Sequence, residues 1–181
     1  ALGQKQIVDA PATVVFVADP LAWKEHHKTL DESVAQGIMS ESYRQLSAQQ
    51  VQTFFATGPL NLVGFLKRLM LPIRRMTQPT PSLITSKEEA AHYVKAQTML
   101  AAATFMLAAE GVGLGTCPME GFDEERLKKL LAIPNYLKVP VIVAVGYALD
   151  EESGQTSVRR PLSEKLSVDL FPNKLEKIRG R

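Results

Sequence analysis

One glycine-rich segment, Gly111–Phe122, carries the residue types in this sequence best suited to hold a ligand. Three glycines fall within five residues, and Pro118, Met119, Glu120 and Gly121 follow. Glycine has no side chain to keep a ligand away from the backbone, so such a segment can lay its amide groups against a flat or anionic molecule. It can also simply end a helix and turn the chain, and by itself the segment favours helix termination.

Other chemistries find little support in the sequence. The glycines lack the Lys-Ser/Thr of a phosphate-binding P-loop, and they follow a helical pattern instead of the strand of a dinucleotide fingerprint. Cys117 has no basic neighbour to lower its pKa, which favours a small packed side chain over a nucleophile. No Gly-x-Ser-x-Gly motif indicates a serine hydrolase. The histidines have no ligand partners at metal-binding spacing, so we expect no metal site. Arg159 and Arg160 could bind a phosphate, or form an ordinary surface pair.

Composition narrows the class of protein. With 181 residues, 45% of them hydrophobic, the chain suits a single domain spanning 1–181. A net charge of +2 argues against nucleic-acid binding. One cysteine excludes an internal disulfide and suits a reducing, cytoplasmic location. The apolar run 60–73 is interrupted by Lys67, Arg68 and Pro72, so we expect no membrane span.

The elements that would position these residues are two strands among several helices. Continuous apolar, β-branched runs at 12–18 and 139–147 predict strands buried on both faces, with Pro140 at the start of the second. Helices are predicted at 21–34, at 41–56 and, capped by Asp123, at 124–131. The sequence therefore predicts an α+β fold.

A long helix opens at Ser86 with the pattern Ser-Lys-Glu-Glu, a capping box. Apolar and small residues cover nearly all of its circumference, which predicts a buried central helix and a candidate dimer interface. Those at regular helical spacing are Tyr93, Ala96, Gln97, Leu100, Thr104, Leu107 and Ala108.

Taken together and in order, several segments resemble the nitroreductase family of FMN-dependent oxidoreductases. The resemblance covers nearly the whole chain, loosely over 60–83. Its segments are Val8–Pro11, Ala96–Leu100, Gly113–Asp123, Ile133–Pro134, Val139–Tyr147 and Arg159–Leu162.

This resemblance implies a three-layer fold, with a central antiparallel or mixed sheet flanked by helices, in an intertwined homodimer. It implies FMN as cofactor, with NAD(P)H reducing the FMN and a nitroaromatic, quinone or related small-molecule acceptor taking the electrons. Pro118, Met119, Glu120 and Gly121 match the loop that packs on the flavin ring, and Arg159 matches a basic position near the FMN phosphate. No catalytic side chain is implied, because the cofactor carries the chemistry.

The sequence departs from the family pattern in two places, and one further segment has two explanations. Family members begin with several dozen residues that carry a phosphate clamp, which this sequence lacks, so it is either a fragment or a shortened relative. Ser157 stands where many relatives have lysine. Phe54, Phe55 and the segment 58–76 match the part that overhangs the flavin from the partner subunit, which implies a substrate wall or lid. A packed helix with solvated basic residues explains the segment 58–76 equally well.

Two other functions stay open. The chain could be a non-catalytic or weakly flavin-binding dimeric scaffold or regulatory relative. It could also keep the flavin and perform specialised chemistry such as dehalogenation or flavin fragmentation.

Overall fold

The computed structural model describes residues 3–147 and 160–167. The chain divides into two compact units, 1–148 and 149–181, which are described separately. In the second unit the described residues form a short 3-10 helix, Leu162–Glu164. Everything that follows concerns the first unit.

A three-stranded antiparallel sheet forms the centre of this unit. Strand β3 (Lys138–Gly146) lies in the middle, between β1 (Ala12–Ala18) and β2 (Gly115–Met119). Strands β1 and β3 are the two strands that the sequence predicts. Burial on both faces is confirmed for β3 but was wrong for β1, an edge strand in which only Ala18 is buried. The third lies inside the glycine-rich segment, where the sequence predicts only a loop, so that prediction was wrong for residues 115–119.

Strand β2 escapes prediction because its sequence, Gly-Thr-Cys-Pro-Met, is short and contains proline. Its residues form a strand because they pair with β3, from Gly115↔Gly146 to Met119↔Ile142, although their local sequence does not favour one. Pro118 is tolerated because β2 is an edge strand, half of whose N–H groups face away from the neighbouring strand.

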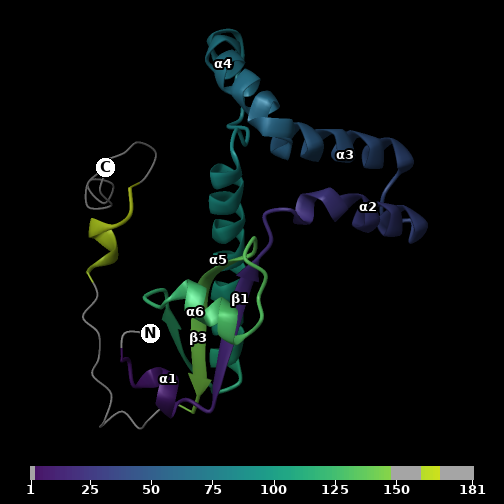
Figure 1. Cartoon of the computed structure of the whole chain (residues 1–181). Coiled ribbons are helices and arrows are strands. Elements are labelled where there is room, and N and C mark those ends of the chain that lie inside the picture. Colours follow the sequence, from purple (N-terminus) through teal and green to yellow (C-terminus); the bar gives the residue numbers. More distant parts are fainter. Residues whose placement is uncertain (1–2, 148–159, 168–181) are drawn as a thin grey trace, which may run out of the picture. The chain divides into compact units, whose positions relative to one another are not determined.

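Helices cover both faces of the sheet, which confirms the three-layer α+β fold (Figure 1). Helix α5 (Lys87–Gly111) packs on one face, where Ala102 contacts a cluster containing Val141, Val143 and Val145. Helices α1 (Gln6–Asp9) and α6 (Glu124–Leu130) pack on the other, against Ile142 and Ala144. Successive residues of β3 thus face the two helical layers in turn. Both faces of the strand are covered, which explains its continuous apolar sequence.

Pro140 occupies a bulge and not the first position of its strand. Phe16 pairs with Val141, but Ala18 pairs with Lys138, so β3 carries one extra residue opposite β1. A bulge accommodates a proline inside a central strand, because the ladder is interrupted there. It also turns Val139 toward the α6 face, where that side chain is 3% exposed.

Helix α5 begins as predicted, but it is buried on one face only. Ser86 Oγ accepts a hydrogen bond from Glu89 N (3.1 Å), and the Glu89 carboxylate accepts one from Thr85 N (2.7 Å). Leu100 and Leu107, on the regularly spaced stripe, are 63% and 76% exposed. The expectation of burial all round was therefore wrong for the single chain, because the sheet covers only the opposite face.

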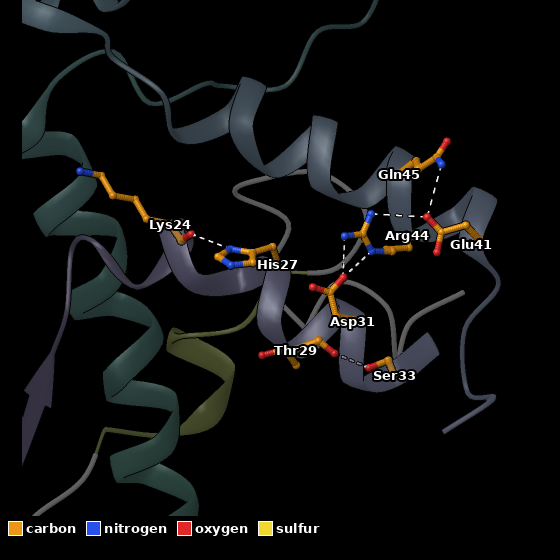
Figure 2. Close-up of polar contacts among 8 residues, drawn as sticks. All are labelled: Lys24, His27, Thr29, Asp31, Ser33, Glu41, Arg44 and Gln45. Atoms are coloured by element: carbon orange, nitrogen blue, oxygen red, sulfur yellow. Dashed lines mark hydrogen bonds and ion pairs between the residues drawn. The ribbon is translucent and has the colours of Figure 1, made fainter. Parts of the chain in front are cut away.

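Between β1 and α5 the chain forms three more helices: α2 (His26–Ala35), α3 (Glu41–Phe55) and α4 (Leu62–Thr77). The predicted helix at 21–34 begins instead as a 3-10 turn, Ala22–Glu25. An ion pair between Asp31 and Arg44 joins α2 to α3, and Arg44 also contacts Glu41 (Figure 2). No helix among the described residues is long and apolar enough to span a membrane.

Candidate functional site

The end of β2 and the turn that follows it hold the four residues of the predicted flavin loop, Pro118, Met119, Glu120 and Gly121. Met119, the last residue of β2, is 4% exposed and packs with Ile142 and Ala144. Glu120 and Gly121 then lie exposed at the surface. The buried methionine thus anchors a short stretch of accessible backbone to the core.

Gly121 is the central residue of a tight turn. Phe122 N donates to Glu120 O (3.0 Å), two residues back, which is the pattern of a γ-turn. Within residues 3–147 and 160–167, the N–H of Gly121 donates to no acceptor. An exposed amide without a partner, held beside a buried side chain, can donate to an acceptor atom of a bound molecule.

Helix α6 fixes the far end of this turn. Asp123 Oδ1 accepts from Arg126 N (3.0 Å) as its N-cap. Glu124 then accepts from the buried Lys128 (2.7 Å) and from Val139 N (3.0 Å), which joins the helix to the bulge in β3. Burial raises the pKa of Glu124, but these hydrogen bonds, with the charges of Lys128 and Lys95, outweigh it and hold the pKa below its usual value.

Phe54 and Phe55, predicted on the substrate side, lie in an aromatic cluster that the sequence did not reveal. Phe55 stacks on Trp23 (centroids 6.0 Å apart, planes at 9°), and both phenylalanines meet Tyr93 edge to face at 5.4 Å. Trp23, Phe55 and Tyr93 come from three separate elements, so no local spacing could have indicated their meeting. The cluster connects the C-terminus of α3 to α5.

Each phenylalanine borders a different cavity. Phe55 lines one of about 650 Å³ together with Trp23, Tyr136, Lys24 and Lys138. Phe54 lines another, of about 990 Å³, together with residues of α4 and α5. Residues 118–121 line neither cavity. Among the described residues, the predicted flavin loop therefore lines neither of the two cavities that the predicted substrate side borders.

Two further predictions concern other parts of the chain. Arg159 lies outside the described residues, and the neighbouring Arg160 is exposed. Among the described residues, no three His, Cys, Asp or Glu side chains gather where they could hold a metal ion.

Comparison with known families identifies the fold and its family. The family model described as "Nitroreductase family" matches residues 14–147, which include β2, β3, all but the first two residues of β1, and the turn at Gly121. The chain belongs to the nitroreductase family. This confirms the family resemblance that the sequence motifs indicate.

A curated relative matches most of this chain. An "NADH dehydrogenase" of Thermus thermophilus is 28% identical over 162 residues, which are 90% of this chain and 63% of that protein. The chain thus spans less than two thirds of that relative's length.

Two solved structures share the fold. A candidate nitroreductase of Bacillus subtilis superimposes with a TM-score of 0.68 at 22% identity, over 92% of this chain and 68% of the other. A candidate nitroreductase from Exiguobacterium sibiricum, in complex with FMN, gives 0.62 at 18% identity, over 90% and 64%.

Proposed function

We propose that this nitroreductase-family chain is part of an FMN-dependent oxidoreductase that uses NAD(P)H to reduce nitroaromatic, quinone or related small-molecule acceptors. The observation that carries the proposal is the exposed turn at Gly121, beside the buried Met119, where the Gly121 N–H has no acceptor among the described residues. FMN would alternately accept electrons from NAD(P)H and pass them to the acceptor, which is the two-step chemistry that the cofactor supplies.

The residues of the turn suit a flavin ring. The exposed Pro118 would form an apolar support, Met119 would anchor the turn from the core, and Glu120 and Gly121 would present backbone to the ring edge. The Gly121 N–H would donate to an acceptor nitrogen of the flavin, and such a hydrogen bond would stabilise the electron-rich reduced form. Arg159 would bind the phosphate, because a guanidinium pairs well with phosphate oxygens.

We propose that the working unit is a homodimer in the cytoplasm. The outward face of α5 supports this, because it is apolar, uncharged from Ala96 to Ala109 and exposed in the single chain. A second protomer would cover this face. It would also supply Phe54 and Phe55 to the substrate side of the first protomer's flavin, consistent with the separate locations of these parts within one chain.

Gly121 offers a test with a matched control. An inverse γ-turn has a central φ near the value that proline prefers, so Gly121→Pro can keep the turn while removing the N–H. Gly121 is not among the residues with positive φ, so Gly121→Ala keeps both the turn and the N–H. FMN affinity, followed by quenching of flavin fluorescence, should fall about tenfold in Gly121→Pro and little in Gly121→Ala.

The same preparation tests turnover. With FMN bound, the protein should oxidise NADH or NADPH when a nitroaromatic or a quinone is present. If the protein quenches no flavin fluorescence and shows no turnover, the proposal fails and a dimeric scaffold or regulatory role becomes the better explanation.

A further inference from the structure

Helix α4 turns one side toward its own chain, and Lys67 lies on that side. Gly64, also on this side, approaches the backbone of Thr85 so closely that a Cβ could not fit. At 100° per residue, Gly64 and Lys67 lie opposite the exposed apolar face of the helix, which Arg68 and Arg74 flank. The residues of that apolar face are Leu62, Phe65, Leu66, Leu69, Met70, Ile73 and Met76.

Three main-chain carbonyl groups accept hydrogen bonds from the ammonium group of Lys67. Lys67 Nζ donates to Ala56 O (2.6 Å), Ile84 O (3.2 Å) and Phe54 O (3.3 Å). Partial burial lowers the pKa of Lys67, because it penalises the charged form. The three carbonyl acceptors match the three N–H donors of the ammonium group and offset this cost. Lys67 therefore joins α4 to the end of α3 and to the loop that precedes α5.

These contacts complete the C-terminus of α3. The last carbonyl groups of a helix have no partners within the helix, and a cationic side chain is favourable beside them. Helix α3 ends at Phe55, and Ala56 after it is extended instead of left-handed. Ile84 N also donates to Phe54 O (3.1 Å). The end of α3 is thus held by groups from distant parts of the chain.

The two bonded carbonyl groups at the end of α3 stand on either side of Phe55. Because Phe54 O and Ala56 O both accept from Lys67, the main chain at Phe55 is held at two points. The Phe55 ring stacks on Trp23 and lines the cavity of about 650 Å³. Lys67 thus fixes the backbone from which one aromatic wall of this cavity projects.

We propose that Lys67 is a positioning residue that holds Phe55 in place for binding of the electron acceptor. An aromatic wall suits the planar ring of a nitroaromatic or a quinone. Lys67 is not among the described residues that line the cavity, so it would act through Phe55 and not by contact with the acceptor. This inference rests on the proposed function, which gives Phe55 to the substrate side of the flavin.

Trp23 reports on this arrangement without any flavin, because it is the only tryptophan of the chain and stacks on Phe55. Lys67→Met removes the ammonium group and keeps an unbranched side chain. The stack should loosen, so the fluorescence of Trp23 should shift to longer wavelength and acrylamide should quench it more strongly. Arg74→Met removes the same charge from an exposed position of α4, and it should change neither signal.

Reoxidation of the reduced flavin tests the acceptor site. The protein with FMN is reduced by dithionite and mixed in stopped flow with a naphthoquinone or with ferricyanide. The naphthoquinone should react about tenfold more slowly in Lys67→Met, because its aromatic wall is displaced. Ferricyanide has no aromatic ring to pack and should react as fast as in the unmodified protein. Arg74→Met should react normally with both.

A double-mutant cycle separates positioning of Phe55 from a general loss of structure. Phe55→Leu removes the aromatic ring and should slow the naphthoquinone reaction about as much as Lys67→Met does. Adding Lys67→Met to Phe55→Leu should then cause no further loss. Circular dichroism should show that every variant is folded. If Lys67→Met does not fold, Lys67→Gln, which keeps two N–H donors, should show the same changes to a smaller degree.

Three results would overturn the inference. The first is unchanged fluorescence of Trp23 in the folded Lys67 variant. The second is a naphthoquinone rate that falls no more than the ferricyanide rate. The third is a further loss when Lys67→Met is added to Phe55→Leu. If the unmodified protein binds no FMN, the proposed function fails, whereas the fluorescence of Trp23 still decides whether Lys67 holds Phe55.

Discussion

Helices α4 and α5 both expose apolar residues, yet the polar residues around those faces differ. The outward stripe of α5 contains Tyr93, Leu100 and Leu107, with alanine, glutamine and threonine between them. The face of α4 is flanked by Arg68 and Arg74. An uncharged face can be buried against another protein surface without leaving an unpaired charge, whereas a cation-flanked face fits a partner that offers many anions. The outward face of α5 therefore suits the second protomer that we propose, and its basic flanks set the α4 face apart from it.

The two helices also differ in how the chain holds them. Helix α5 is joined to the sheet through a cluster of buried side chains around Ala102. Helix α4 depends on a close backbone approach at Gly64 and on the ammonium group of Lys67. Side-chain packing against the sheet holds α5 in place, whereas a few polar contacts and one close backbone contact hold α4.

The largest expected effect comes from a charge placed on the outward stripe of α5. Leu107→Arg should raise the dimer dissociation constant about a hundredfold or more, because the charge would be buried without a partner. Leu69→Arg, the same change on α4, should leave the dimer intact. Sedimentation velocity over a dilution series measures both, and dissociation by Leu69→Arg alone would reverse the comparison.

A smaller effect is expected at the anchor of α4. Gly64→Ala would push the helix away from Thr85 at a cost of about 1–3 kcal/mol. Trypsin cleavage within α4 should then become roughly ten- to a hundredfold faster, because cleavage follows the population of the open form.

The control for this change is Gly111→Ala at the end of α5. A Cβ there meets nothing within 4 Å, and it should leave the cleavage rate unchanged. If the two variants are cut equally fast, the close approach at Gly64 does not hold α4.

The smallest effect concerns Glu124, whose carboxylate lies 4.0 Å from Lys95 of α5 and hydrogen-bonds to Lys128. Its pKa is lowered in the folded protein, so its contribution to stability is present above the ordinary value of 4.5 and is lost as the pH falls through the lowered pKa. Glu124→Gln should reduce the free energy of unfolding by about 1 kcal/mol at neutral pH.

The loss should shrink in acid, where the native carboxyl is itself protonated. Chemical unfolding of the two proteins at neutral pH and at a pH below the lowered pKa of Glu124 makes the comparison. A loss independent of pH would show that the charge of Glu124 does not contribute, and cleavage within α4 should be unaffected in either case.

The sequence located the parts whose structure depends on near neighbours. Ser86 and Asp123 cap helices as predicted, since each cap is a contact between residues three apart. Strands β1 and β3 were found because their apolar runs require cover on both faces. The motif at Gly121 was found through family resemblance, and its role in flavin binding stays a proposal.

Contacts between distant residues could not be found in this way. Strand β2 exists because Gly115–Met119 lies beside β3, and the bulge at Pro140 exists because β1 sets the register. The contact between Phe55 and Trp23 likewise joins residues from separate elements, which no helical or strand periodicity could bring together.

The sequence by itself determined the α+β class, the helix caps, the two long strands and the family, because these follow from local propensity, period and motif. Only the tertiary structure decided which side of each helix faces the chain. Helical spacing shows that α4 and α5 have apolar faces, but it does not say where the sheet or Thr85 lies. That direction depends on packing between segments far apart in sequence, and it leaves Leu107 and Leu69 exposed in the single chain.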